Sequence, residues 1–134
     1  MPDQITEILK DSKTIAVVGL SDDRTRPSYG VSEYMQDHGY RIIPVHPTAE
    51  TVLGEKVYRS LGEIPDKIDV VDVFRRPDAV PAIVEEVIAL KIPALWLQET
   101  VVHEEAAEKA RKAGVKVVMD LCILKEHRAR RGSF

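Results

Sequence analysis

The stretch Ile15-Ala-Val-Val-Gly-Leu-Ser21, followed after a short gap by Pro27-Ser28-Tyr29-Gly30, decides the fold of this chain. Its first half is short, apolar and rich in β-branched residues, which is typical of a strand covered on both faces. Gly19 then leads into a polar, basic loop, after which we expect a helix. Backbone N–H groups and the positive end of the helix dipole both point to that loop. The stretch therefore predicts a site for phosphate groups near the start of an α/β fold.

Other segments share the character of this strand and predict a parallel sheet. The expected strands are Thr14–Val18, Arg41–Val45, Val70–Phe74, Ala94–Leu97 and Val115–Met119. Apolar residues at helical spacing lie between them and at both ends of the chain. The expected helices fall near Ile5–Leu9, Val31–His38, Val80–Ile88, Ala106–Ala113 and Leu121–Arg130. A long insertion at 48–66 contains a predicted hairpin at 53–58 and one helical turn at 60–64.

Strands that alternate with helices imply right-handed crossovers and a doubly wound sheet. We therefore predict an α/β, Rossmann-like, three-layer sandwich in which residues 1–134 form a single domain. The predicted sheet has five parallel strands in the order 3-2-1-4-5. Its switch point lies between strands 1 and 4, where ligands gather beyond the carboxyl ends of the strands.

The composition argues against nucleic acid and membranes as partners. The formal net charge is -3, which gives no overall attraction to nucleic acid or to an anionic membrane. The apolar runs are too short to span a bilayer, and the single cysteine, Cys122, rules out an intrachain disulfide framework. We expect a cytoplasmic protein that binds a small molecule as a monomer or weak homodimer.

The first loop differs from the dinucleotide fingerprint G-x-G-x-x-G. Leu20 and Ser21 follow Gly19, so the second glycine, which lets the backbone approach a pyrophosphate, is missing. The second predicted strand ends in Pro44-Val45-His46-Pro47 without the carboxylate that binds the ribose of NAD. Both observations argue against NAD.

A nucleotide with an additional phosphate on its ribose fits better, because it requires cations and no acid. Coenzyme A and NADP are the two common ligands of this kind. Basic and imidazole side chains fall at the predicted carboxyl ends of strands or in neighbouring loops: Arg24, Arg26, His46, Lys56, Arg75 and Arg76. On a different fold, each of these would be an ordinary solvated surface residue.

At this point the sequence resembles a known family, the small stand-alone CoA-binding proteins, which are similar to the CoA-binding domain of the succinyl-CoA synthetase α subunit. The resemblance runs over nearly the whole chain. It is carried by Val18-Gly-Leu-Ser21, Arg26-Pro-Ser-Tyr-Gly-Val31, Gly39-Tyr-Arg-Ile-Ile-Pro-Val45, Pro47, Val52-Leu-Gly54, Val73-Phe-Arg75, Trp96-Leu-Gln98 and Val118-Met-Asp120 with Cys122.

The resemblance implies a Rossmann-type fold that binds coenzyme A or an acyl-CoA. It implies that the loop after the first strand and the start of the next helix surround the phosphates, and that residues after strands 2 and 3 flank the nucleotide. The predicted cofactor-binding residues are Gly19, Leu20, Ser21, Arg24, Arg26, Pro27, Ser28, Tyr29, Val45, His46, Pro47, Lys56, Phe74, Arg75, Arg76 and Gln98. The family usually has glycine where this chain has Thr100, whose side chain narrows the space near the fourth strand.

The sequence indicates no catalytic residue and no metal site. The synthetase carries its phosphorylated histidine in a second domain, so the resemblance implies no ligase activity here. Neither C-x-x-C nor H-x-x-x-H occurs. Asp120 is expected to cap the last helix, and Cys122 is expected to be a small buried residue.

Three hypotheses remain open from sequence. The first is a CoA-binding module without catalysis of its own. The second is an oxidoreductase-like or sensor domain that binds NADP(H). The third is a protein-interaction subunit with a vestigial nucleotide site.

Overall fold

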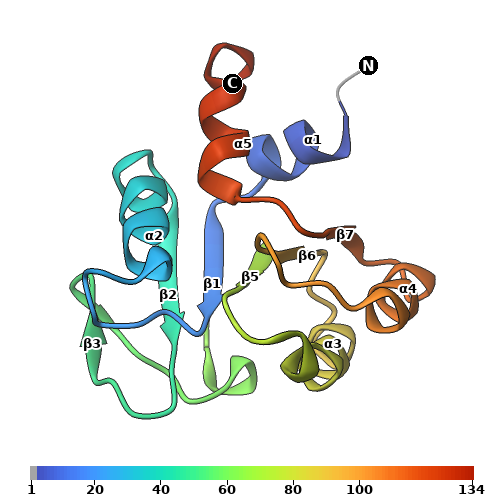
Figure 1. Cartoon of the computed structure of the whole chain (residues 1–134), viewed down its shortest axis with the longest axis horizontal. Coiled ribbons are helices and arrows are strands. Elements are labelled where there is room, and N and C mark those ends of the chain that lie inside the picture. Colours follow the sequence, from blue (N-terminus) through green and yellow to red (C-terminus); the bar gives the residue numbers. More distant parts are fainter. Residues whose placement is uncertain (1–2) are drawn as a thin grey trace.

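The computed structural model describes residues 3–134 and consists of a central sheet with helices on both faces (Figure 1). The sheet strands are β1 (Thr14–Val18), β2 (Arg41–Val45), β5 (Val70–Val73), β6 (Ala94–Leu97) and β7 (Lys116–Val118). The helices are α1 (Gln4–Asp11), α2 (Pro27–Asp37), α3 (Val80–Ala89), α4 (Glu104–Lys112) and α5 (Ile123–Ala129). A small hairpin, β3 (Thr51–Val52) and β4 (Glu55–Lys56), and 3₁₀ turns at Leu61–Glu63, Pro77–Ala79 and Arg131–Ser133 complete it.

The five-stranded sheet is parallel throughout and has the order β2-β1-β5-β6-β7. This confirms the predicted Rossmann-like α/β architecture, but the third predicted strand, β5, lies beside β1 and not outside β2. The position outside β2 is taken by Tyr58, which forms an isolated parallel bridge with Val45. Counting this bridge as the third member gives the order 3-2-1-4-5-6, whose first five members follow the predicted pattern 3-2-1-4-5. Tyr58 of the insertion is the outer partner of β2. The third predicted strand, β5, therefore lies on the other side of β1, where the fourth strand was predicted.

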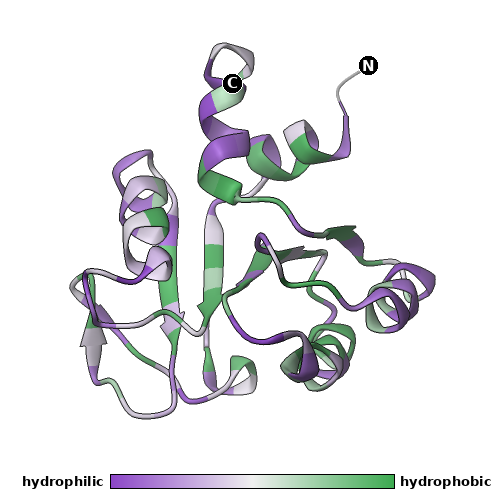
Figure 2. Ribbon diagram, viewed as in Figure 1, coloured by the Kyte–Doolittle hydropathy of each residue, from purple (hydrophilic) through white to green (hydrophobic). Residues whose placement is uncertain are grey.

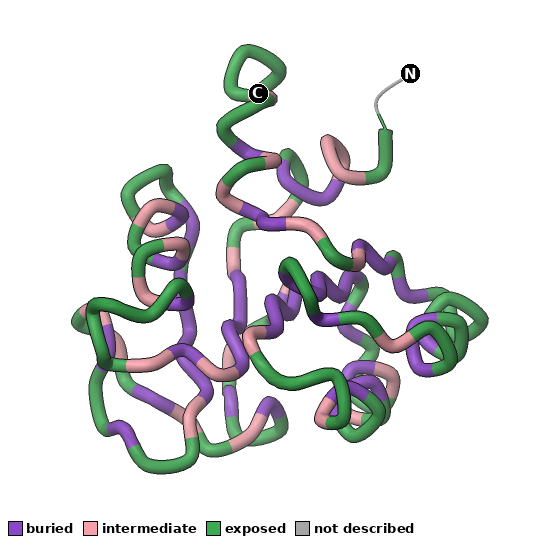
Figure 3. Tube along the Cα trace, in the orientation of Figure 1, coloured by how far each residue is buried: buried purple, intermediate pink, exposed green. Residues whose placement is uncertain are grey.

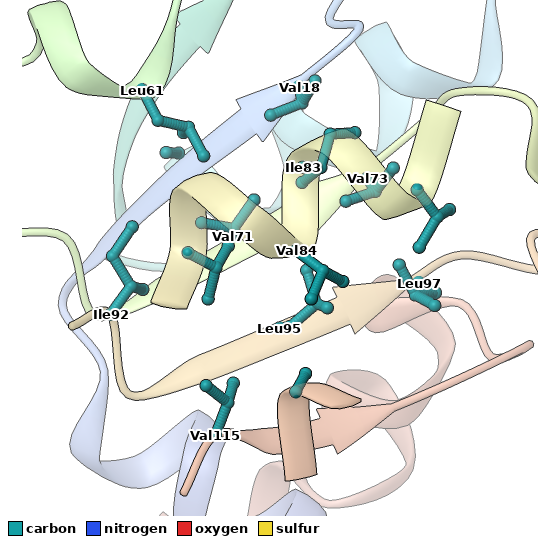
Figure 4. Packing of buried hydrophobic residues seen from close by; sticks show 14 of the residues in the cluster. Val18, Leu61, Val71, Val73, Ile83, Val84, Ile92, Leu95, Leu97 and Val115 are labelled. Carbon is teal, nitrogen blue, oxygen red and sulfur yellow. The ribbon is translucent and has the colours of Figure 1, made fainter. Parts of the chain in front are cut away.

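The sheet separates two apolar cores. Helices α3 and α4 cover one face, where Val71, Val84 and Leu95 pack together (Figure 4). Helices α1, α2 and α5 cover the other face, which centres on the fully buried Trp96. Figure 2 shows hydrophobic residues concentrated in the strands, and Figure 3 shows the same segments buried. No helix within residues 3–134 is long and apolar enough to cross a membrane.

Local sequence explains where the helices begin and end. The carboxylate of Asp3 caps α1 by accepting the Thr6 N–H at 2.7 Å. Gly39 and Gly114 follow α2 and α4 in the left-handed conformation, with φ of 95° and 91°. His103 caps α4, since its Nδ1 accepts the Ala106 N–H at 3.1 Å.

Gly19 ends β1 at a point where a side chain has no room. Its φ is 89°, and a Cβ built there would lie 2.4 Å from the carbonyl oxygen of Phe74. The Phe74 N–H in turn donates to the Val18 carbonyl at 2.9 Å, which holds the ends of β1 and β5 together. Glycine at this position therefore allows the close approach of two strand ends.

We predict that Gly19→Ala lowers the free energy of unfolding by at least about 2 kcal/mol, because both its φ and the Phe74 carbonyl oppose a Cβ. Chemical denaturation measures the loss. Gly30→Ala is the matched control: Gly30 lies inside α2 with nothing within 4 Å of its added Cβ, so this change should stabilise by about 0.5–1 kcal/mol. Equal stability of the Gly19→Ala variant and the parent would contradict the packing described here.

A carboxyl group lies inside the sheet itself. Asp72 of β5 is 1% exposed, between Val17 of β1 and Trp96 of β6. The Gln98 side-chain N–H donates to its Oδ1 at 2.6 Å. Burial raises the pKa of Asp72 to about 7, and the hydrogen bond from Gln98 offsets only part of this shift.

A raised pKa in the folded state means that the folded protein binds more protons than the unfolded chain. We therefore predict that the free energy of unfolding falls as the pH rises from 3.8, the ordinary pKa of aspartate, to about 7. Asp72→Asn, which keeps an acceptor for Gln98, should remove this dependence and stabilise the protein at pH 8 by roughly 2–4 kcal/mol. Urea denaturation across this pH range checks the slope. Parallel stability curves for the variant and the parent would show that Asp72 stays ionised.

Candidate functional site

A cleft of about 1140 Å³ lies at the carboxyl ends of the sheet strands, between the loops that follow β1, β2, β5 and β6 and helix α5. The edge is the one at which parallel sheets of this class bind ligands, next to the point where the chain reverses direction between β1 and β5. The switch point thus lies beside β1, as predicted, and β5 is the strand on its other side.

The cleft brings together most of the residues predicted from the sequence. The predicted residues that line it are Gly19, Ser21, Arg26, Pro27, Ser28, His46, Pro47, Phe74, Arg75, Arg76 and Gln98. They come from four separate segments of the chain, which only the folding of the sheet makes adjacent.

The other predicted residues do not line it. Leu20 and Val45 are buried in the two cores. Tyr29 of α2 is partly buried and packs against the core that contains Trp96. The Arg24 guanidinium is exposed and lies 5.9 Å from the centre of the Tyr29 ring. Lys56 lies on the hairpin, over the ring of Tyr58 at 5.2 Å.

The loop from β1 to α2 leaves the start of the helix open to a ligand. Ser28 Oγ accepts the Ser21 N–H at 3.1 Å, which folds the loop back against the helix. The residue before α2 is Arg26, and no side chain caps the first turn. Pro27 has no N–H, and the Tyr29 N–H donates to the Arg26 carbonyl at 3.1 Å, so among the first three helix residues Ser28 supplies the N–H group. An N–H group at a helix start and the positive end of the helix dipole favour an anion.

Ser21 stands where a dinucleotide fold has its second glycine. The preceding Leu20 is fully buried, so its side chain anchors the loop in the core.

Positive charge is concentrated on the cleft. Its charged lining consists of Arg26, Arg75, Arg76, Lys125 and Arg128 against one acid, Glu99. Within residues 3–134, no ion pair forms at Arg75, Arg76 or Arg128, and that of Arg26 with Asp23 is long, at 3.9 Å, and exposed. A chain of net charge -3 thus places uncompensated cations at one edge of its sheet, which is an arrangement that attracts an anionic ligand.

The end of β2 contributes an ordered imidazole. His46 Nδ1 accepts the N–H groups of Thr48 and Ala49, at 3.2 and 3.0 Å. In the neutral ring the proton therefore resides on Nε2. A second hollow of about 280 Å³ adjoins the cleft and shares His46, Pro47 and Arg75 with it.

The opposite wall was largely missed by sequence reasoning, apart from Gln98 and the Thr100 side chain. It consists of the Gln98–Val101 turn after β6, of Cys122 just before α5, and of Leu124, Lys125 and Arg128 along α5. A last helix was predicted near Leu121–Arg130, but none of its residues was assigned to the site. Helix α5 instead lies against α2, where Tyr34 donates or accepts a 3.0 Å hydrogen bond with His127 Nδ1, so Leu124 and Arg128 face the cleft.

Asp120 does not cap α5. The cap position is Cys122, without a side-chain hydrogen bond, and Asp120 instead accepts the Thr100 N–H on Oδ1 at 2.7 Å. The carboxylate thus joins the loops after β6 and β7. The prediction was wrong because it considered only the helix that follows Asp120 in sequence.

The chemistry of the cleft is that of binding. Residues 3–134 hold no cluster of three metal-ligating side chains. Cys122 is buried, as predicted. The cleft combines cations from the loops after β1 and β5 and from α5 with apolar side chains such as Val101 and Leu124, which suits an elongated, partly apolar anion.

Comparisons with known proteins agree with this geometry. A family model described as a CoA binding domain matches residues 13–128. The uncharacterized protein YneT of Bacillus subtilis (strain 168) is 49% identical over 124 residues, which cover 92% of each chain.

More distant relatives and solved structures extend the comparison. The alpha subunit of acetate–CoA ligase [ADP-forming] I of Pyrococcus furiosus is 27% identical over 128 residues, covering 84% of this chain and 28% of that protein. A solved structure of a hypothetical protein from Pyrococcus horikoshii OT3 is 41% identical, with a TM-score of 0.90 over 93% of this chain and 88% of that one. With the family model matching most of its length, the chain belongs to the CoA binding domain family.

Proposed function

We propose that this protein binds coenzyme A, or an acyl-CoA, in the cleft at the carboxyl ends of its strands, with the β1–α2 loop around the phosphates. The observation that carries the proposal is the set of uncompensated cations beside the open start of α2. Coenzyme A has a diphosphate and a ribose phosphate, so both features would act on it together. We further propose that residues 1–134 act as one binding unit, as a monomer or weak homodimer.

The two ends of the cleft suggest an orientation. Arg75 lines the smaller hollow together with His46 and Pro47, and Arg76 follows it on the cleft wall; these two cations suit the phosphorylated adenosine. Val101, Cys122 and Leu124 offer apolar surface for the pantetheine chain and its thiol, with Lys125 and Arg128 on the same wall. The diphosphate would then lie between these ends, at Ser21 and Arg26.

We propose binding without catalysis, because no nucleophile paired with a base lies on the cleft wall in residues 3–134. The NADP(H) hypothesis is weaker on this structure. Ser21 stands in place of the glycine at which a dinucleotide fold brings its pyrophosphate against the backbone.

We predict that Arg26→Ala weakens coenzyme A binding by about 1–3 kcal/mol, since a charged hydrogen bond to phosphate is lost. Isothermal titration calorimetry measures the change. Arg24→Ala is the matched control, because Arg24 belongs to the same loop and lies outside the cleft lining; its effect should stay below about threefold. Equal losses in the two variants would mean that the loop attracts the ligand by general charge alone.

Removal of one phosphate gives a second prediction. Dephospho-CoA should bind more weakly than coenzyme A in the parent protein, and the difference should shrink in Arg75→Ala and Arg76→Ala. In a thermal-shift assay, coenzyme A should stabilise the protein at concentrations where NADPH does not. Stabilisation by NADPH alone, or no binding of any CoA species at millimolar concentration, would refute the proposed function.

A further inference from the structure

The turn after β6 carries an unusual residue for its conformation. The Val101 N–H donates to the Gln98 carbonyl at 2.9 Å, which closes a four-residue turn. Its third residue, Thr100, has a φ of 71°, whereas the second, Glu99, has no positive φ. That pattern is a type II turn, in which the third position favours glycine. A β-branched residue there is strained.

This turn is held firmly from several sides. Asp120 Oδ1 accepts the Thr100 N–H at 2.7 Å, and Lys125 Nζ of α5 lies 3.0 Å from Glu99 Oε2. Gln98 is tied to the buried Asp72 at 2.6 Å. With Gln98 4% and Val101 6% exposed, the turn is anchored at both ends. These buried ends and the Asp120 hydrogen bond oppose a shift of the whole turn that would relieve the Thr100 backbone.

Thr100 is exposed and lines the cleft. It follows β6 and is joined to Asp120 near Cys122, whereas His46 and Pro47 follow β2 on the other side of β1. A glycine would satisfy the turn without strain, and it would leave this end of the cleft wider by the volume of the threonine side chain.

We propose that Thr100 determines ligand specificity by limiting the space at the thiol end of the cleft, so that the site accepts coenzyme A and short acyl-CoA species and excludes long acyl chains. This inference rests on the proposed function and adds to it the class of acyl group. Thr100 keeps a strained backbone at the edge of the cleft, where Asp120 and the Glu99–Lys125 pair hold the turn. A proposed contact between its side chain and the ligand, which glycine could not make, would account for this strain.

The test compares binding of coenzyme A, acetyl-CoA and octanoyl-CoA by calorimetry, below the critical micelle concentration of the long-chain species. In the parent, octanoyl-CoA should bind more weakly than coenzyme A. Thr100→Gly should raise the affinity for octanoyl-CoA, relative to that for coenzyme A, by on the order of tenfold. Relief of the backbone strain should also raise Tm by roughly 3 °C.

Three further variants separate volume from strain. Thr100→Ala keeps the strain but removes volume, so it should shift the selectivity without raising Tm. Thr100→Val keeps the shape and should keep the parent selectivity. Lys91→Gly is the matched control, because Lys91 also has a positive φ, 56°, but lies after α3 and outside the cleft. It should raise Tm and leave selectivity unchanged.

The outcomes distinguish this inference from the proposed function. Binding of coenzyme A with the same selectivity in the parent, Thr100→Gly and Thr100→Ala would overturn the role of Thr100 and leave the proposed function intact. Absence of binding to all three ligands in the parent would overturn both. A selectivity change in Lys91→Gly equal to that in Thr100→Gly would likewise overturn the role of Thr100, since strain relief alone would then be the cause.

Discussion

The close contact between Gly19 and the Phe74 carbonyl is the constraint on which the site depends. It brings the carboxyl ends of β1 and β5 so near that a Cβ would lie 2.4 Å from that oxygen. The Arg75 side chain also lies against Gly19, because its Cδ would be 3.0 Å from a Cβ built on that glycine. Two loops that are far apart in sequence thereby share one cleft, and their cations face the open start of α2.

Charge placement connects this packing to binding. The chain is acidic overall, and eight of its 19 lysines and arginines form ion pairs with carboxylates, such as Lys109 with Glu85 and Arg41 with Asp66. Exposed pairs of this kind contribute little stability. Arg75, Arg76 and Arg128 form no ion pair within residues 3–134 and lie together on the cleft wall as a positive region. The cleft can therefore attract an anionic ligand although the whole protein does not.

The sequence predicted those parts of the fold that depend on local patterns. Strands β1, β2 and β6 match the expected segments residue for residue, because apolar runs bounded by turn residues leave little freedom. The position of β5 could not be predicted, since it depends on Tyr58 bridging to β2 across a long insertion. Nothing in the sequence indicated that Lys125 and Arg128 of the last helix face the cleft, and the Asp120 contact joins residues 20 apart. Long-range packing decided each of these points.

A crystal structure of the protein grown with excess coenzyme A tests the central claim most directly. The account predicts electron density for the diphosphate at Ser21, Arg26 and the first turn of α2, with the adenosine toward His46 and the thiol toward Thr100 and Cys122. Coenzyme A bound on another face of the molecule, or an empty cleft in crystals whose solution form binds the ligand, would contradict it.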